Sequence, residues 1–469
     1  MKTFKQKALI SALAGASALA MAGAANAVYV NQDGLGQALV YPYYTVRNGN
    51  TTLISVVNTT TQAKAVKVRF LEGKNSQEVL DFNLYLSAKD VWTSAVVATA
   101  TGASVTTTDK SCTNPTIPAA GAPFRNFAYT TDANPTLDRT REGYVEMLEM
   151  ATIPNGTALG VAVTHVAGTP PCTAARINDA GIATATGLSA PSGGLFGNGT
   201  IVNVLGGAST GYDATAFDGW TNRTNLTSSG SRFPNLSNGT STVSVVNSSG
   251  NIYVANWLNA IDAVSATIMH SAVYGEYAFT TDNVIGTDWV ITMPTKNQYV
   301  NLGVLPPFSS AWDSSALTSC DTVGLAGYDR EEGTSSTPDD FSPRPPSGTN
   351  ALCWEANVIT FGTGSATGST NAVGISPIQN GGAAVATSGK EGGWLELTFT
   401  SPVARLTSLA SSTITTTSSG APTTGAPAAQ TYVGLPVIGF ALSSASFKTG
   451  NPQQNFSNSY SLRFQRTIR

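Results

Sequence analysis

The sequence has few charged residues, only two histidines and only four cysteines. Charged side chains make up 11% of the 469 residues, against about 25% in an average globular domain. A coiled coil and a highly charged disordered chain are therefore both excluded. The net charge of −3 at pH 7 gives no electrostatic basis for binding nucleic acid or an anionic membrane. The 41% of hydrophobic residues is enough to fill a sizeable core.

The N-terminus has the pattern of a secretory signal peptide. Lys2, Lys5 and Lys7 precede an apolar stretch, and the small-residue sequence at 25–27 ends it, as signal peptidase sites do. We therefore expect residues 1–27 to be removed. No later run of about 18 apolar residues occurs, so no transmembrane anchor is expected.

All four cysteines follow the expected cleavage site, which fits an oxidising compartment. Four cysteines allow three pairings, and we favour Cys112 with Cys172 and Cys320 with Cys353, because each pair then lies within one half of the chain. A zinc site would need short Cys-x-x-Cys spacing, which is missing. We predict two disulfides and no metal site.

Alternation of apolar and polar residues predicts strands along the whole chain. Residues 65–86 form two alternating runs around a turn, as in a hairpin with one buried face, and residues 394–399 alternate in the same way. The segment 257–268 differs, because its apolar residues have helical spacing. We predict a mainly β protein with one short helix, built as an antiparallel β-sandwich of Ig-like or jelly-roll-like type.

A weak internal sequence similarity can be interpreted as evidence of two related β-domains. Residues 53–60 resemble residues 242–249, although chance similarity between Ser/Val-rich strands is the favoured explanation. The expected division is an N-terminal sandwich over residues 28–240 and a C-terminal sandwich over residues 241–469. We expect long surface loops in four stretches rich in Ser, Thr, Gly and Pro: 103–123, 333–350, 363–390 and 408–430.

One motif suggests an enzyme. Gly207, Ser209 and Gly211 match the G-x-S-x-G pattern of a hydrolase nucleophile elbow, and Asp262 and His270 follow in the order of a catalytic triad. A true elbow is followed at once by a helix within an alternating β/α pattern, and neither is evident here. We interpret the motif as a glycine-rich turn and do not expect an enzyme.

Two groups of carboxylates are candidates for calcium binding or acid/base chemistry. Glu142, Glu146 and Glu149 form one group, and residues 329–332 form the other. The calcium-loop spacing is absent, and Arg330 neutralises its neighbours. We therefore predict no cofactor, with calcium as the one alternative.

Aromatic residues provide two further hypotheses. Leu39, Tyr41, Tyr43 and Tyr44 surround Pro42, which cannot donate to a β-ladder, so this segment is predicted to be an edge strand or a bulge open to assembly with another copy. Aromatic side chains also stack on sugars. The candidates for such a platform, most of which otherwise belong to the core, are Tyr41, Tyr43 and Tyr44 together with Trp92, Trp220, Trp257, Trp289, Trp354 and Trp394.

Several stretches resemble a family of secreted proteobacterial proteins that are usually described only as hypothetical or cell-surface proteins. The resemblance is carried by residues 34–45, 68–73 through Trp92, 286–296 and 328–332. It implies export in a Gram-negative cell and a surface role, and it provides no catalytic residues.

Together these patterns predict a structural or adhesive protein of the cell surface or extracellular matrix. It would self-assemble into filaments or a surface layer, with copies of itself, other surface proteins or polysaccharide as partners. The alternatives are a carbohydrate-binding adhesin and, less favoured, a secreted serine hydrolase. Periplasmic location is left open, because a signal peptide only directs a chain across the inner membrane.

Overall fold

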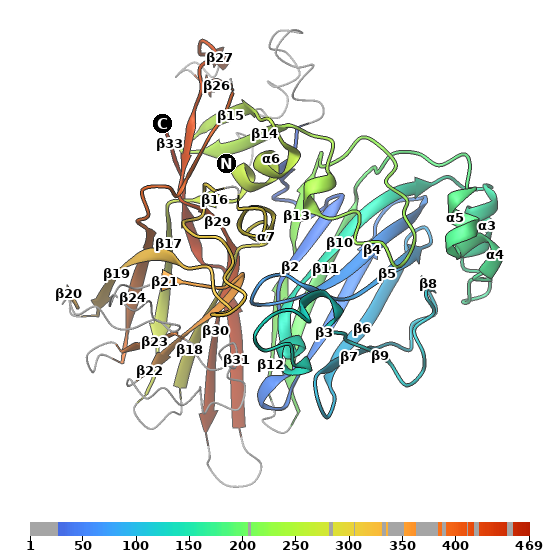
Figure 1. The fold of residues 1–469 in the computed structure, drawn as a ribbon, viewed down its shortest axis with the longest axis horizontal. Coiled ribbons are helices and arrows are strands. Elements are labelled where there is room, and N and C mark those ends of the chain that lie inside the picture. The colour runs from blue at the N-terminus through green and yellow to red at the C-terminus, as the bar shows by residue number, and fades with distance from the viewer. Residues whose placement is uncertain are drawn as a thin grey trace, which may run out of the picture.

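Seven β-sheets contain the strands of the residues that the computed structural model describes (Figure 1). These residues are 27–204, 208–280, 285–303, 305–330, 334–335, 351–362, 383–386, 391–409, 411–416, 422–447 and 454–469. All strand pairs in these sheets are antiparallel except β22 with β23. The protein is thus mainly β, as the alternating pattern predicts. The expected signal peptide lies outside the described residues apart from Ala27.

Two large sheets form the N-terminal half. The seven-stranded sheet has, in spatial order, β1 (Tyr29–Val30), β13 (Thr215–Asp218), β2 (Ala38–Thr45), β10 (Glu142–Ile153), β4 (Ala63–Glu72), β5 (Glu78–Leu86) and β8 (Cys112–Asn114). The six-stranded sheet has β12 (Ala208–Asp213), β11 (Leu195–Asn203), β3 (Asn50–Asn58), β6 (Val91–Ala98), β7 (Ala103–Thr106) and β9 (Ala122–Pro123).

The two sheets share a hydrophobic core. Tyr41 of β2, Val68 of β4, Ile54 of β3 and Trp92 of β6 belong to one buried cluster. The predicted hairpin is present as β4 and β5, but β4 is buried along its whole length, so the expectation of a single buried face is wrong. The polar face is covered because residues distant in sequence pack over it, and Ser229 accepts a hydrogen bond from Lys67.

Five smaller sheets form the C-terminal half. The first contains β14 (Val243–Ser248), β15 (Asn251–Asn256), β26 (Ser411–Thr416) and β27 (Pro422–Thr424), and the second pairs β16 (Met269–His270) with β29 (Leu435–Pro436). The third contains β20 (Thr334–Ser335), β19 (Asp321–Asp329), β24 (Gly392–Phe399), β17 (Ala272–Ala278) and β32 (Arg463–Gln465), with β21 (Ala351–Leu352) beside β19. The fourth contains β23 (Ala383–Ala386), β22 (Ala356–Gly362), β18 (Ile285–Thr292), β30 (Ile438–Phe447) and β31 (Gln454–Tyr460), and the fifth contains β25 (Arg405–Thr407), β28 (Thr431–Val433) and β33 (Thr467–Ile468).

Helices are short and lie between the sheets or at their ends (Figure 1). The α-helices are α3 (Ala158–Val163), α4 (Ala174–Ile177), α5 (Asp179–Ala183), α6 (Ala260–Thr267) and α7 (Asn297–Val300), and the 3-10 turns are η1 (Arg47–Gly49), η2 (Phe127–Tyr129), η3 (Leu137–Arg141) and η4 (Leu236–Asn238). The apolar spacing at 257–268 correctly predicts α6. The expectation of one helix is wrong, since the others are too short for a periodic pattern to show.

The two halves meet in a continuous core. Val290 of β18 and Phe440 of β30 belong to the same buried cluster as Tyr41 and Trp92. The ring of Tyr212 on β12 stacks on Phe440, with centroids 4.6 Å apart and planes 13° apart. The N-terminal sheets therefore complete their packing with side chains from the C-terminal half.

All four expected loops contain strands. β7, β8 and β9 lie within 103–123, β20 within 333–350, β23 within 363–390, and β26 and β27 within 408–430. Most of 333–350 and of 363–390 lies outside the described residues. Short strands rich in Thr and Ser lack the apolar alternation that marks a strand in sequence.

Candidate functional site

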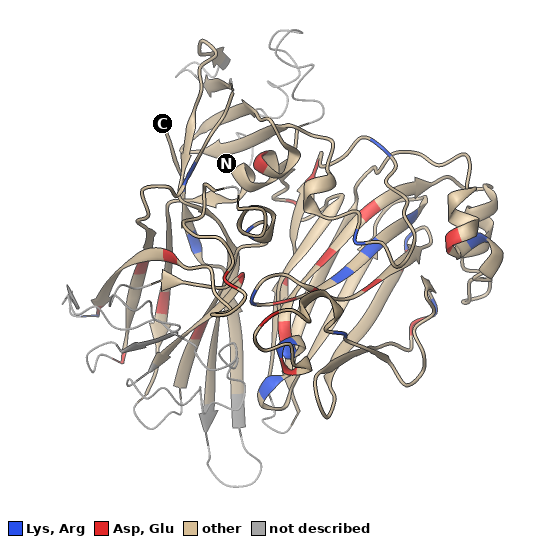
Figure 2. Ribbon diagram, viewed as in Figure 1, with Lys and Arg blue, Asp and Glu red and all other residues tan. Residues whose placement is uncertain are grey.

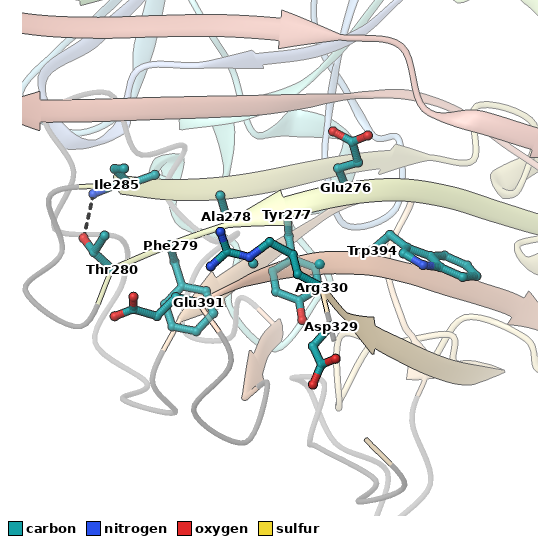
Figure 3. Close-up of a pocket in the computed structure, with 12 residues that line it drawn as sticks. Glu276, Tyr277, Ala278, Phe279, Thr280, Ile285, Asp329, Arg330, Glu391 and Trp394 are labelled. Carbon is teal, nitrogen blue, oxygen red and sulfur yellow. Dashed lines mark hydrogen bonds between the residues drawn. The ribbon is translucent and has the colours of Figure 1, made fainter. Parts of the chain in front are cut away.

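A groove of about 570 Å³ opens at one end of the sheet formed by β17, β19 and β24 (Figure 3). Its lining comprises Glu276, Tyr277, Ala278, Phe279, Thr280, Ile285, Asp329, Arg330, Glu391, Gly392, Gly393 and Trp394. These residues come from three parts of the chain: 276–285, 329–330 and 391–394. Sheet pairing brings β17, β19 and β24 together, since Trp394 lies opposite Glu276 on one side and opposite Tyr328 on the other.

The alternation of β24 directs Trp394 outward. Leu395, Leu397 and Phe399 are buried, whereas the side chain of Trp394 is 40% exposed. Gly393 precedes it, and a Cβ at that position would lie 2.1 Å from the carbonyl oxygen of Tyr328. A glycine is therefore required where β24 passes close to β19 beside the groove.

Three aromatic side chains form what we call the aromatic platform: Tyr274, Tyr328 and Trp394. The ring of Tyr328 stacks on Trp394, with centroids 4.2 Å apart and planes 14° apart. The ring of Tyr274 lies on the other side, 6.3 Å away and tilted by 43°. Tyr274 and Tyr328 are half-buried. Together with Trp394 they present a partly open aromatic surface at the mouth of the groove.

Polar groups surround the platform. The hydroxyl of Tyr274 lies 2.9 Å from a carboxylate oxygen of Glu396 and 2.6 Å from Oε1 of Gln465. Partial burial and the hydrogen bond to Glu396 raise the pKa of the Tyr274 phenol. Carboxylates accept hydrogen bonds and a side-chain amide both donates and accepts them, so the platform is bordered by groups that bind hydroxyls.

The groove is more acidic than basic. Glu276, Asp329 and Glu391 line it together with one cation, Arg330. In the part of the chain that the structure describes, no three His, Cys, Asp or Glu side chains are grouped as a metal site requires. The arrangement can bind a polar, uncharged or cationic ligand through stacking and hydrogen bonds.

The triad suggested by sequence is not assembled among the described residues. Ser209 lies within β12, opposite Val202, and no helix follows it. Asp262 accepts a hydrogen bond from the Tyr299 hydroxyl at 2.8 Å. His270 is buried in β16, and its Nδ1 has no hydrogen-bond partner. Burial lowers the pKa of His270 well below its usual value.

A second Ser-His-Asp group occurs near the surface, but its geometry differs from that of a triad. Ser87 Oγ lies 2.8 Å from Nδ1 of His165, and Asp90 lies 3.5 Å from the same nitrogen. In a triad the serine and the acid contact opposite nitrogens of the ring. His165 follows α3 in the sequence.

The glutamates of β10 are paired with cations. Glu142 contacts Arg47, Glu146 contacts Arg69, and Glu149 contacts Lys64. These carboxylates balance buried positive charges and do not form a calcium cluster. The second acidic group is divided, because Asp329 and Arg330 line the groove, whereas residues 331 and 332 lie outside the described residues.

The proposed assembly segment lies inside the molecule. Leu39, Tyr41, Tyr43 and Tyr44 are fully buried, and β2 lies between β13 and β10 in the seven-stranded sheet. The carbonyl of Pro42 accepts a hydrogen bond from Thr292 of the C-terminal half. The predicted bulge is present, since the register between β2 and β10 shifts between Gly143 and Val145, but this segment offers no exposed edge for a second copy.

Of the tryptophans predicted as candidates for a sugar-stacking platform, one is exposed. Trp92, Trp220, Trp257, Trp289 and Trp354 are buried, whereas Trp394 is exposed. Sequence reasoning did not identify Tyr274, Glu276 and Tyr328 as site residues. The period-two pattern of β17 assigns Tyr274 and Glu276 to one face, but only the sheet pairing shows that this face adjoins Trp394.

Both favoured disulfides are formed, Cys112–Cys172 and Cys320–Cys353, which indicates an oxidising location outside the cytoplasm. None of the helices in the described ranges has the length and apolarity of a membrane span. No protein-family model, curated protein or solved structure matches the chain.

Proposed function

We propose that the protein is an exported adhesive surface protein that binds carbohydrate through the aromatic platform and the adjoining groove. The observation that carries this proposal is the exposure of Trp394 between two tyrosines on a rigid sheet face. Aromatic rings offer apolar area to the C–H faces of sugars, while neighbouring polar groups fix the orientation. The family resemblance in the sequence, which implies a surface role, stays a prediction.

The charge of the groove restricts the ligand. Glu276, Asp329 and Glu391 outnumber Arg330, so a polysaccharide of uronic acids or sulfated sugars would be repelled. Neutral sugars have no such penalty, and their hydroxyls can donate to the carboxylates. We therefore infer a neutral or amino-sugar polymer as the ligand class.

Packing of the two N-terminal sheets supports the assignment of this half as a β-sandwich. The hydroxyl of Tyr41 on β2 donates to the carbonyl of Ser55 on β3 at 2.7 Å, which links the two sheets across their shared core. We infer a sandwich in this half.

Affinity electrophoresis tests the proposed function. The mature protein is run through gels that contain a neutral glucan, a deacetylated amino-sugar polymer or a uronate polymer. We expect retardation by the first or second polymer, and an increase in Kd of about fivefold for Trp394→Ala, because an aromatic contact is worth about 1 kcal/mol. The matched control is Phe127→Ala, at an exposed aromatic residue on η2. Retardation by the uronate alone, or equal binding by Trp394→Ala and wild type, would overturn the proposal.

A further inference from the structure

Charged residues of both signs lie along β4, β5 and β10 (Figure 2), and Arg69 of β4 contacts Glu146 of β10. Lys67 on β4 has a fully buried side chain and contacts Oδ2 of Asp81 on the neighbouring strand β5. The side chain of Asp81 is 17% exposed. Arg69 on β4 and Glu78 on β5 are the other charged groups that act on this pair.

This contact differs from the two other lysine–carboxylate contacts among the described residues. Lys64 donates a hydrogen bond to Glu149 at 2.7 Å, and Lys296 donates one to Asp321 at 2.9 Å. Oδ2 of Asp81, by contrast, is buried without a hydrogen-bond partner. Lys67 Nζ donates instead to the carbonyl of Ser229 at 2.7 Å. The amine thus contacts the carboxyl group as an ion pair that lies outside the geometry of a normal hydrogen bond.

The surroundings favour the neutral forms of both groups. Burial lowers the pKa of the Lys67 amine, and burial together with the charge of Glu78 raises the pKa of Asp81 to about 6. A neutral amine has a lone pair, and a protonated carboxyl group has a hydroxyl that can leave as water. These are the reactants of amide formation.

We propose that Lys67 and Asp81 condense into an intramolecular isopeptide bond that joins β4 to β5. The lone pair of Nζ attacks Cγ of the protonated carboxyl group, and a C–N bond forms. The C–O bond to the hydroxyl breaks, and the hydroxyl leaves as water with one proton from the amine. No oxidant or other reactant is needed. Because the fold holds the two groups in contact, the entropic part of the activation barrier is lowered.

Such a bond would give the hairpin a lateral covalent link. Lys67 lies opposite Asn83 in the ladder, so the link would hold the register of β4 and β5 against slippage. An exported adhesive protein is exposed to shear and proteases, and a cross-link between adjacent strands opposes both by preventing local opening.

Intact-mass measurement of the reduced mature protein tests the inference. We expect the wild type to be lighter than its sequence mass by one water molecule, and Lys67→Arg and Asp81→Ala each to have the full sequence mass. Lys296→Arg, the matched control at a hydrogen-bonded buried pair, should keep the deficit. A tryptic digest of the wild type should contain one branched peptide in which residue 67 is joined to residue 81, and this readout does not depend on any variant folding.

Three results would overturn the inference. The first is a wild type at full sequence mass. The second is a water loss located in a single linear peptide or retained in Asp81→Ala. The third is a loss of ammonia instead of water, which would place the bond on Asn83, whose buried Oδ1 also has no hydrogen-bond partner.

Discussion

Ser76 and Glu355, which are 279 residues apart in the sequence, are joined by a hydrogen bond between the Ser76 hydroxyl and a fully buried carboxyl group. Ser76 belongs to the turn between β4 and β5, and its oxygen also lies 2.6 Å from the Tyr144 hydroxyl. The amide of Glu355 donates to the carbonyl of Gly73 in the same turn at 3.1 Å. The turn between β4 and β5 in the N-terminal half therefore binds the C-terminal half through the buried residue Glu355.

The acid at this junction makes stability depend on pH. Burial raises the pKa of Glu355 from 4.5 to about 8. Between these values the unfolded chain releases a proton that the folded chain keeps, so the free energy of unfolding contributed by Glu355 falls as the pH rises. We expect Glu355→Gln to flatten this decline by up to about 1.4 kcal/mol per pH unit, measured by urea denaturation between about pH 5 and about pH 8.

Glu276→Gln serves as the control for this experiment, because Glu276 is exposed in the groove. It should leave the pH dependence of unfolding as in the wild type. A decline that is unchanged in Glu355→Gln would contradict the prediction.

Gly434 occupies a position that no other residue can adopt without strain. Its φ is +112°, and an added Cβ would lie 1.7 Å from the carbonyl oxygen of His270. We expect Gly434→Ala to lower the free energy of unfolding by about 2 to 4 kcal/mol. Gly230→Ala, where a Cβ meets nothing within 4 Å, should change it by less than about 0.5 kcal/mol. Similar denaturation midpoints for the two variants would be inconsistent with this packing.

Lys64 and Glu149 form an ion pair with both side chains fully buried. Lys64→Met leaves a buried carboxylate without its cation and should cost about 3 to 5 kcal/mol. Adding Glu149→Gln removes the charge and keeps an acceptor oxygen for one of the two amides, those of Ser192 and Gly193, that donate to Glu149, so the double variant should be more stable than Lys64→Met alone. Chemical denaturation of both variants and the wild type measures this, and a double variant that is less stable than Lys64→Met would refute it.

The two disulfides close segments of different length. Cys112 and Cys172 are separated by 60 residues, and Cys320 and Cys353 by 33. Chain entropy predicts a loss of about 3 to 4 kcal/mol when either is replaced by an alanine pair, slightly larger for the longer segment. Thermal unfolding in the absence of reductant would measure the difference. A variant lacking Cys112 and Cys172 that unfolds at the wild-type temperature would contradict this expectation.

The accuracy of the sequence predictions depended on how local the determining contacts are. The hairpin at 65–86 and helix α6 follow from apolar spacing within one segment, and the structure contains both. The burial of Lys67 could not be predicted, because residues near 229 cover it. Pro42 indicated a bulge correctly, but the interior position of β2 depends on its pairing with β10 and β13, which follow much later in the sequence.

The candidate site was predictable only in part for the same reason. Alternation in 394–399 directs Trp394 away from the core, and this can be read from one strand. The platform also needs β17 and β19, which pair with β24 from more than 60 positions away. A single sequence carries no signal for those pairings, so Tyr274 and Tyr328 could not be assigned to the site.

The core shared by the two halves sets a limit on the order of folding. Phe440 and Leu442 of β30 are part of the cluster that fills the N-terminal sheets, yet they lie close to the end of the chain. Synthesis and export proceed from the N-terminus, so the packing around Tyr41 and Trp92 is incomplete until these last strands are present. The chain thus reaches its native packing only when nearly all of it has been synthesised.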